Sequence, residues 1–258
     1  MLEALTAGAA GLGAASFLVV GAALAWTLRV PDSVVAGIMA FGAGALVSTL
    51  AFELVGEAHS TGGLVPTLGG FLAGAVIYVL ADVALAAAGA RSRKRSVALR
   101  NAPGVHSDPA TGGSASVGLA VALGALLDGI PESLVLGLSI AQGGAVSLTL
   151  LVAVAASNLP EGLGSAAGMK HEGRSARYVF GVWVGISLAS GVAAMLGYVL
   201  LQDASPELVA IVTTIAAGAI LAMVANTLIP EAFKSDRSLT GLWAALGFAL
   251  SFTLYQLG

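Results

Sequence analysis

Long apolar stretches, separated by short polar connections, make up most of this sequence. Each stretch has close to the 20 residues that an α-helix needs to cross the hydrocarbon core of a bilayer. The connections carry proline, serine, glycine and aspartate, which are typical of turns. The pattern predicts eight transmembrane helices, at residues 5–28, 33–57, 63–89, 116–140, 145–169, 175–200, 207–231 and 239–257.

The composition favours the same class of protein. Of the 258 residues, 57% are hydrophobic and 10% are charged, and the mean hydropathy is +0.95. A soluble domain cannot bury so much apolar surface, so we expect one all-α transmembrane domain over residues 1–258. The chain has no cysteine, which excludes a disulfide framework and a thiolate metal site. The first stretch has no basic start, so we interpret it as a membrane helix and not as a cleaved signal peptide.

The basic residues indicate the orientation of the chain in the membrane. All eleven fall at the first, third, fifth and seventh connections: Arg29, Arg91, Arg93, Lys94, Arg95, Arg100, Lys170, Arg174, Arg177, Lys234 and Arg237. By the positive-inside rule, these connections face the cytoplasm. We therefore expect both termini outside, a cytoplasmic loop at residues 90–115, and a multi-pass protein of the cell membrane (plasma or inner). The lipid bilayer is then the expected partner, and such dispersed charges indicate no nucleic-acid partner.

Three Pro-Glu pairs stand within the apolar stretches, at Pro131-Glu132, Pro160-Glu161 and Pro230-Glu231. Proline kinks a helix and leaves a backbone carbonyl without its donor, and a carboxylate in hydrocarbon is costly. Together they place carbonyl oxygens beside an acidic side chain. This combination suits coordination of a cation within the membrane.

Polar residues of the fourth and fifth stretches are predicted to meet at the centre of the bundle. Asp128 and Glu132 are four residues apart on one helix face. Ser157, Asn158 and Glu161 lie at similar depth in the next stretch, which should be an antiparallel neighbour because the connection is short. Three carboxylates cannot stay ionised together in low dielectric without a cation or protons between them. The alternative is that Asp128 and Glu132 are protonated or hydrogen-bonded structural groups.

The two stretches resemble helices 4 and 5 of the ZIP family of divalent-metal transporters, nearest its GufA-like branch. In that family both helices carry a His-Asn-x-Pro-Glu-Gly-like motif that lines the transport site. The matching strings are Asp128-Gly129-Ile130-Pro131-Glu132-Ser133 and Ser157-Asn158-Leu159-Pro160-Glu161-Gly162. The resemblance implies a carrier that moves a divalent metal ion (Zn, Mn, Fe or similar) toward the cytoplasm. It implies Glu132, Asn158 and Glu161 as metal ligands, and a homodimer as one expected assembly.

The departures from the family motif bear on the choice of metal. Asp128 stands where the family commonly has a histidine, and Ser157 stands where it has histidine or glutamine. We therefore expect Asp128 as a substituted ligand and Ser157 as a residue lining the site. A site built from oxygen ligands favours Mn²⁺, Mg²⁺ or Ca²⁺ over Zn²⁺. The stretch 190–194 offers no glutamate for the second metal that some members bind.

Acidic residues also lie near the ends of two stretches. Glu53 and Glu57, near the outer end of the second stretch, are candidates for an acidic entrance, and a solvated or salt-bridged helix end explains them equally. Glu231, near the cytoplasmic end of the seventh, is a candidate to receive a departing ion or to pair with Lys234. Pairs of glycines such as Gly42 with Gly44, Gly69-Gly70 with Gly74, and Gly181 with Gly185 predict close helix packing.

Two other classes of function remain open at the level of sequence. An intramembrane acid–base enzyme is disfavoured because neither a Gly-x-Gly-Asp nor a His-Glu-x-x-His motif occurs, so we expect no enzyme. A family member that has lost transport, and acts as a membrane sensor or scaffold, is consistent with the missing histidines. No P-loop is present to power transport by hydrolysis, and we expect no organic cofactor.

Overall fold

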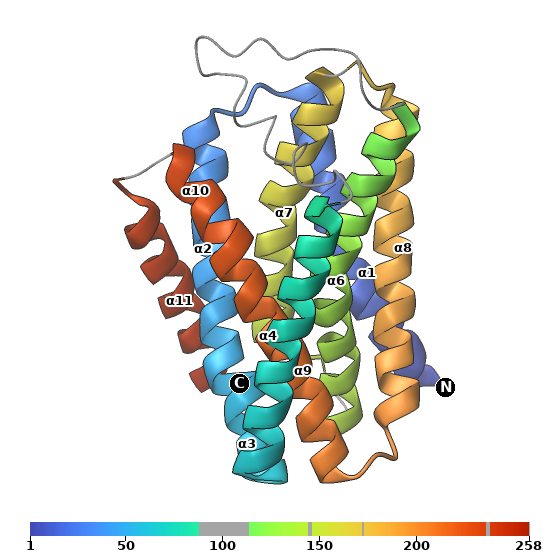
Figure 1. Ribbon diagram of the computed structural model, residues 1–258, viewed down its shortest axis with the longest axis vertical. Helices are drawn as coiled ribbons and strands as arrows, with labels where there is room; N and C mark the ends of the chain where they lie inside the picture. The colour runs from blue at the N-terminus through green and yellow to red at the C-terminus, as the bar shows by residue number, and fades with distance from the viewer. Residues whose placement is uncertain (88–113, 144–145, 172, 236–237, 258) are drawn as a thin grey trace.

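The computed structural model describes the chain except residues 88–113, 144–145, 172, 236–237 and 258. The described part is a bundle of long helices (Figure 1), and each of the eight predicted stretches forms a helix or a continuous helical run. The predicted loop at 90–115 lies outside the described residues, apart from its last two. The helices are α1 (Leu2–Thr27), α2 (Asp32–Thr49), η1 (Leu50–Val55), α3 (Gly56–Gly62), α4 (Leu64–Ala87), α6 (Ser114–Gly143), α7 (Leu148–His171), α8 (Ala176–Leu201), α9 (Pro206–Met223), η2 (Val224–Leu228), α10 (Ile229–Ser235) and α11 (Thr240–Leu257).

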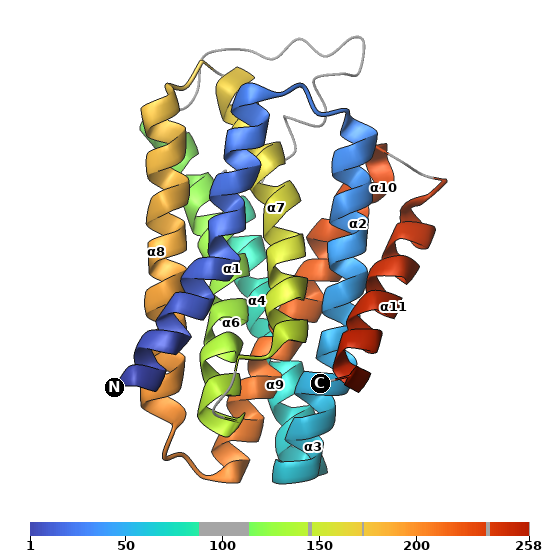
Figure 2. The ribbon, with the colours of Figure 1, turned by 180° about the vertical axis from the view of Figure 1, so that it is seen from behind.

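Seven helical runs in the described part of the chain are long and apolar enough to cross a membrane. The eighth predicted span, α11, is also a helix, but it has 18 residues, carries Tyr255 and Gln256 near its end, and is not among the seven. Both termini lie toward the end of the bundle where α3 is found (Figures 1 and 2). The seven runs are those of a multi-pass membrane protein: Leu2–Thr27, Asp32–Gly62, Leu64–Leu85, Gly124–Gln142, Leu148–Lys170, Ala176–Leu201 and Pro206–Lys234.

The π-helical segments of the described chain do not fall at the two central Pro-Glu pairs. Helices α6 and α7 continue through Pro131 and Pro160. Instead, η1 and η2 are π-helical segments, each inserted in a long helical run. Pro230 is the second residue after η2, and because proline has no N–H, it leaves the carbonyl of Asn226 without its α-helical donor. Short π-helical segments of this kind occur frequently at functional sites.

Helices α1–α4 and α8–α11 form two halves that run in opposite directions. Helix α4 packs on α9 as α11 packs on α2, and α1 packs on α7 as α8 packs on α6. The sequence repeats in the same way at the two π-helical segments, where Leu54-Val55-Gly56-Glu57-Ala58 corresponds to Leu228-Ile229-Pro230-Glu231-Ala232. The fold therefore contains an inverted repeat, an arrangement found in many secondary transporters.

Each of these four close helix pairs has a glycine on both sides. A Cβ atom added at any of the eight glycines would lie between 1.8 and 2.7 Å from a backbone oxygen of the facing helix. Because no side chain fits in that space, the backbones touch directly. The pairs are Gly21 with Gly162 (α1–α7), Gly137 with Gly197 (α6–α8), Gly74 with Gly218 (α4–α9) and Gly44 with Gly247 (α2–α11).

The close pairs divide the bundle into two groups of helices. The site group consists of α1, α6, α7 and α8, and the frame group consists of the α2–α3 run, α4, the α9–α10 run and α11. The boundary between the groups is formed mainly by α2 against α7, with a smaller contact of α6 with α9. At this boundary Gly42 lies against the backbone of Ala156 and Ser157, at 2.9 Å from the position of an added Cβ atom.

Candidate metal-binding site

Glu132 and Ser157 meet between α6 and α7. The two helices are antiparallel, but their backbones make little contact, because α7 packs on α1 and α2 while α6 packs on α8. The two helices thus run antiparallel, as predicted, and they meet through side chains and not through close backbone packing. Their side chains bridge the interval: the Ser157 hydroxyl donates to Glu132 Oε1 at 3.3 Å. Both residues are buried, with exposed fractions of 3% and 2%.

Asp128 lies one helical turn before Glu132 and is buried as well. The Tyr78 hydroxyl, from α4, donates to Asp128 Oδ1 at 2.8 Å. This hydrogen bond joins the frame group to the site group. Sequence reasoning missed Tyr78, although a tyrosine in an apolar helix is a usable signal, because its hydroxyl needs a partner when it is buried.

Asn158 is held by the first helix of the bundle. Its Nδ2 donates to the carbonyl of Ala14 in α1 at 3.1 Å, and its side chain is 5% exposed. An amide that donates through nitrogen to one helix has its carbonyl oxygen directed elsewhere. The amide orientation assigned to Asn158 therefore suits a residue that offers an oxygen ligand, as the family resemblance implies.

Glu161 completes the set of polar residues predicted for the two helices. It is partly buried, and its Oε1 atom is shielded from solvent. Both Glu161 and Asp128 are close enough to Glu132 to interact with its charge. The three carboxylates thus share one neighbourhood. In the part of the chain that the structure describes, however, no three His, Cys, Asp or Glu side chains converge as a ready metal-ligand cluster.

The prolines add backbone oxygens to this neighbourhood. Pro131 and Pro160 are inside α6 and α7, so each leaves the carbonyl four residues earlier without its helical donor. These are the carbonyls of Leu127 and Ala156. The chemistry that the residues offer is therefore that of carboxylate, amide, hydroxyl and carbonyl oxygens, which suits hard divalent cations.

The acidic residues of the second predicted span lie at the outer end of the bundle by the predicted topology. Glu53 is in η1 and only 8% exposed, with Ser147, at the start of α7, as a hydrogen-bond partner. Its Oε2 atom is buried and makes no hydrogen bond. Glu57, four residues on in α3, is exposed and close enough to interact with the charge of Glu53. The two residues thus form an acidic pair that leads from the surface into the bundle.

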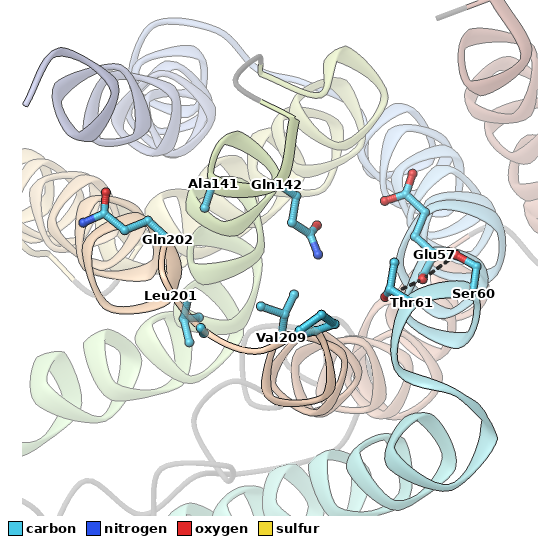
Figure 3. Close-up of a pocket in the computed structure, with 10 residues that line it drawn as sticks. Glu57, Ser60, Thr61, Ala141, Gln142, Leu201, Gln202 and Val209 are labelled. Atoms are coloured by element: carbon cyan, nitrogen blue, oxygen red, sulfur yellow. Dashed lines mark hydrogen bonds between the residues drawn. The ribbon is translucent and has the colours of Figure 1, made fainter.

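A cavity of about 370 Å³ opens beside Glu57. Figure 3 shows that α3 forms one of its walls and that the Gln142 side chain, from the end of α6, points into the space between α3 and α9. Hydroxyl groups of α3 line it as well, and Ser60 and Thr61 both donate to the Glu57 backbone carbonyl, at 2.8 and 2.9 Å. The cavity is therefore a recess with both polar and apolar walls, at the place where the sequence predicts an entrance.

Glu231 is half-buried in α10, at the opposite end of the bundle from α3. The inverted repeat makes it the counterpart of Glu57, since each glutamate comes the same number of positions after the first residue of a π-helical segment, Leu50 in η1 and Val224 in η2. Sequence reasoning treated the two acids separately and missed this relation. The sequence signal for this relation was the similarity of residues 54–58 to residues 228–232.

Comparison with known proteins gives no match, either to a family model or to a curated sequence.

Proposed function

We propose that this protein is a ZIP-like carrier that moves a divalent metal cation across the cell membrane toward the cytoplasm. The observation that supports this best is the buried set of oxygen-bearing residues on α6 and α7, between the two halves of an inverted repeat. In transporters of that architecture, substrate and ions bind near the bilayer midplane where the repeats meet.

The ion would bind through Asp128, Glu132, Asn158 and Glu161, with Ser157 lining the site. Glu132 and Ser157 meet across the interval between the helices, and the other oxygen ligands would have to move toward this pair to complete an oxygen shell. The ion would enter past Glu57 and Glu53 at one end of the bundle and leave past Glu231 at the other end. Movement of the site group against the frame group would expose the ion to one side and then the other.

The first experiment is ion uptake into proteoliposomes, across Mn²⁺, Zn²⁺, Fe²⁺, Cd²⁺, Co²⁺ and Mg²⁺. We expect saturable uptake that both Asp128→Asn and Glu161→Gln abolish. The matched controls, Asp203→Asn and Glu207→Gln, remove exposed acids outside the site and should keep uptake. Absence of flux from folded, inserted protein would contradict the carrier, and saturable binding without flux would favour the sensor or scaffold.

The same uptake assay tests whether the metal is bound by oxygen ligands. Because the predicted ligands are all oxygens, we expect Mn²⁺ to be preferred over Zn²⁺. Introducing an imidazole with Asp128→His should move the preference toward Zn²⁺. A wild-type preference for Zn²⁺ that Asp128→His leaves unchanged would contradict this assignment.

A further inference from the structure

The buried face of α4 is a stripe of small residues that ends in one large side chain. Among the described residues of this helix, the buried positions are Thr67, Gly70, Gly74 and Tyr78, and the opposite side is exposed. Gly70 and Gly74 lie directly against the backbone of α9. Tyr78 comes one turn later on the same face, and its side chain is 3% exposed.

Packing alone does not explain a tyrosine at this position. The ring lies in the main apolar cluster of the bundle, among residues of α2, α6, α7 and α9, where phenylalanine would serve equally. Burying a hydroxyl is unfavourable unless it is hydrogen-bonded. The Tyr78 hydroxyl is directed at Asp128 Oδ1, at 2.8 Å.

This hydrogen bond lies on the boundary between the site group and the frame group. Helix α4 packs along α9 and touches α6 only over a short stretch. If the site group shifts against the frame group, the hydroxyl and the carboxylate separate. The Tyr78 hydroxyl therefore helps to orient the Asp128 carboxylate in the present arrangement of the two groups, and a shifted arrangement would break this hydrogen bond.

From this placement we infer that Tyr78 is a positioning residue, which orients Asp128 for the divalent cation in one conformation of the carrier. The inference rests on the proposed function. Groups that orient a metal ligand through a hydrogen bond typically change metal affinity by about 10- to 100-fold when they are removed. Tyr78 would thus set the affinity for the ion on the membrane face to which this conformation gives access.

The test is Tyr78→Phe, which keeps the ring and removes the hydroxyl. We expect Mn²⁺ binding to purified protein, followed by the electron paramagnetic resonance signal of free Mn²⁺, to weaken about tenfold. In right-side-out and inverted vesicles, KM for Mn²⁺ should rise by about this factor from one face and stay within about twofold from the other. Vmax should be retained. The matched control is Tyr198→Phe, which removes the hydroxyl that donates to Glu3 near the N-terminus and should bind Mn²⁺ as the wild type does.

A double-mutant comparison separates positioning from a general effect on the fold. If Tyr78 acts through the Asp128 carboxylate, adding Tyr78→Phe to Asp128→His, which keeps a ligand but has no carboxylate to orient, should weaken metal binding no further. Wild-type affinity in Tyr78→Phe, or an equal rise of KM on both faces, would overturn the inference and leave the carrier intact. Absence of Mn²⁺ binding by the wild-type protein would overturn the proposed function, and this inference with it.

Discussion

The helix pairs inside each group differ from the boundary between the groups. Inside the groups, each close pair holds two glycines that bring backbone against backbone, as Gly74 and Gly218 do between α4 and α9. At the boundary, Gly42 of α2 lies against the backbone of α7, and side-chain hydrogen bonds such as that of Tyr78 with Asp128 join the two groups. Contacts of the first kind cannot slide without a clash, whereas a side-chain contact can break and reform. The difference indicates which parts of the bundle move together and where relative movement is least hindered.

The largest effect is expected from a side chain placed inside a close pair. An added Cβ at Gly74 would lie 1.8 Å from the carbonyl oxygen of Ile215, so Gly74→Val forces α4 away from α9. Overpacking of this kind costs about 1–3 kcal/mol, and more where the backbone must move. We expect little folded protein, measured as monodisperse protein and thermal unfolding in detergent.

The control for this change is Gly181→Val on α8. No atom lies within 4 Å of a Cβ at Gly181, and the residue is exposed. This variant should unfold close to the wild-type temperature. Equal losses in the two variants would show that the close pairs have no special role in stability.

An intermediate effect is expected at the boundary. Gly42→Ala places a methyl group 2.9 Å from the backbone of Ala156 and Ser157, beside the candidate site. A displacement of about 1 Å at a functional centre can reduce activity by about 100-fold. We expect a smaller displacement and a loss of metal uptake of about tenfold, with a smaller fall in unfolding temperature than for Gly74→Val. Gly185→Ala, on the exposed face of α8, is the matched control. Normal uptake by Gly42→Ala would contradict a functional boundary at α2–α7.

The smallest effect concerns the acids related by the inverted repeat. Glu57→Gln should raise KM about threefold for ions presented at the α3 end, and Glu231→Gln should do so for ions presented at the α10 end. These are attractions of a hydrated ion to a charge near the surface, so both effects should shrink at high salt. Metal uptake from each face, measured at low and at high salt, tests both KM effects and their salt dependence. Effects of equal size on both faces would contradict separate entrance and exit roles.

Some glycine predictions fail for a reason that the sequence does not contain. Gly44, Gly70 and Gly74 lie in close contacts, as their spacing predicts, whereas nothing approaches Gly181 and Gly185 on the exposed side of α8. Gly70 with Gly74 on α4 has the same four-residue spacing as Gly181 with Gly185 on α8. Whether it faces a neighbouring helix depends on how the helix is rotated in the bundle, and that rotation is set by the packing of all its neighbours.

The sequence by itself determined the helices of this protein, because apolar runs of bilayer length have no other way to satisfy their backbone hydrogen bonds in hydrocarbon. It also pointed to the polar residues in those runs, since each is costly there. The tertiary structure decided which of them meet. It separated α6 from α7, placed Glu132 opposite Ser157, and brought Tyr78, 50 positions away in the chain, to Asp128. Such contacts depend on close packing between distant segments, which local sequence patterns do not encode.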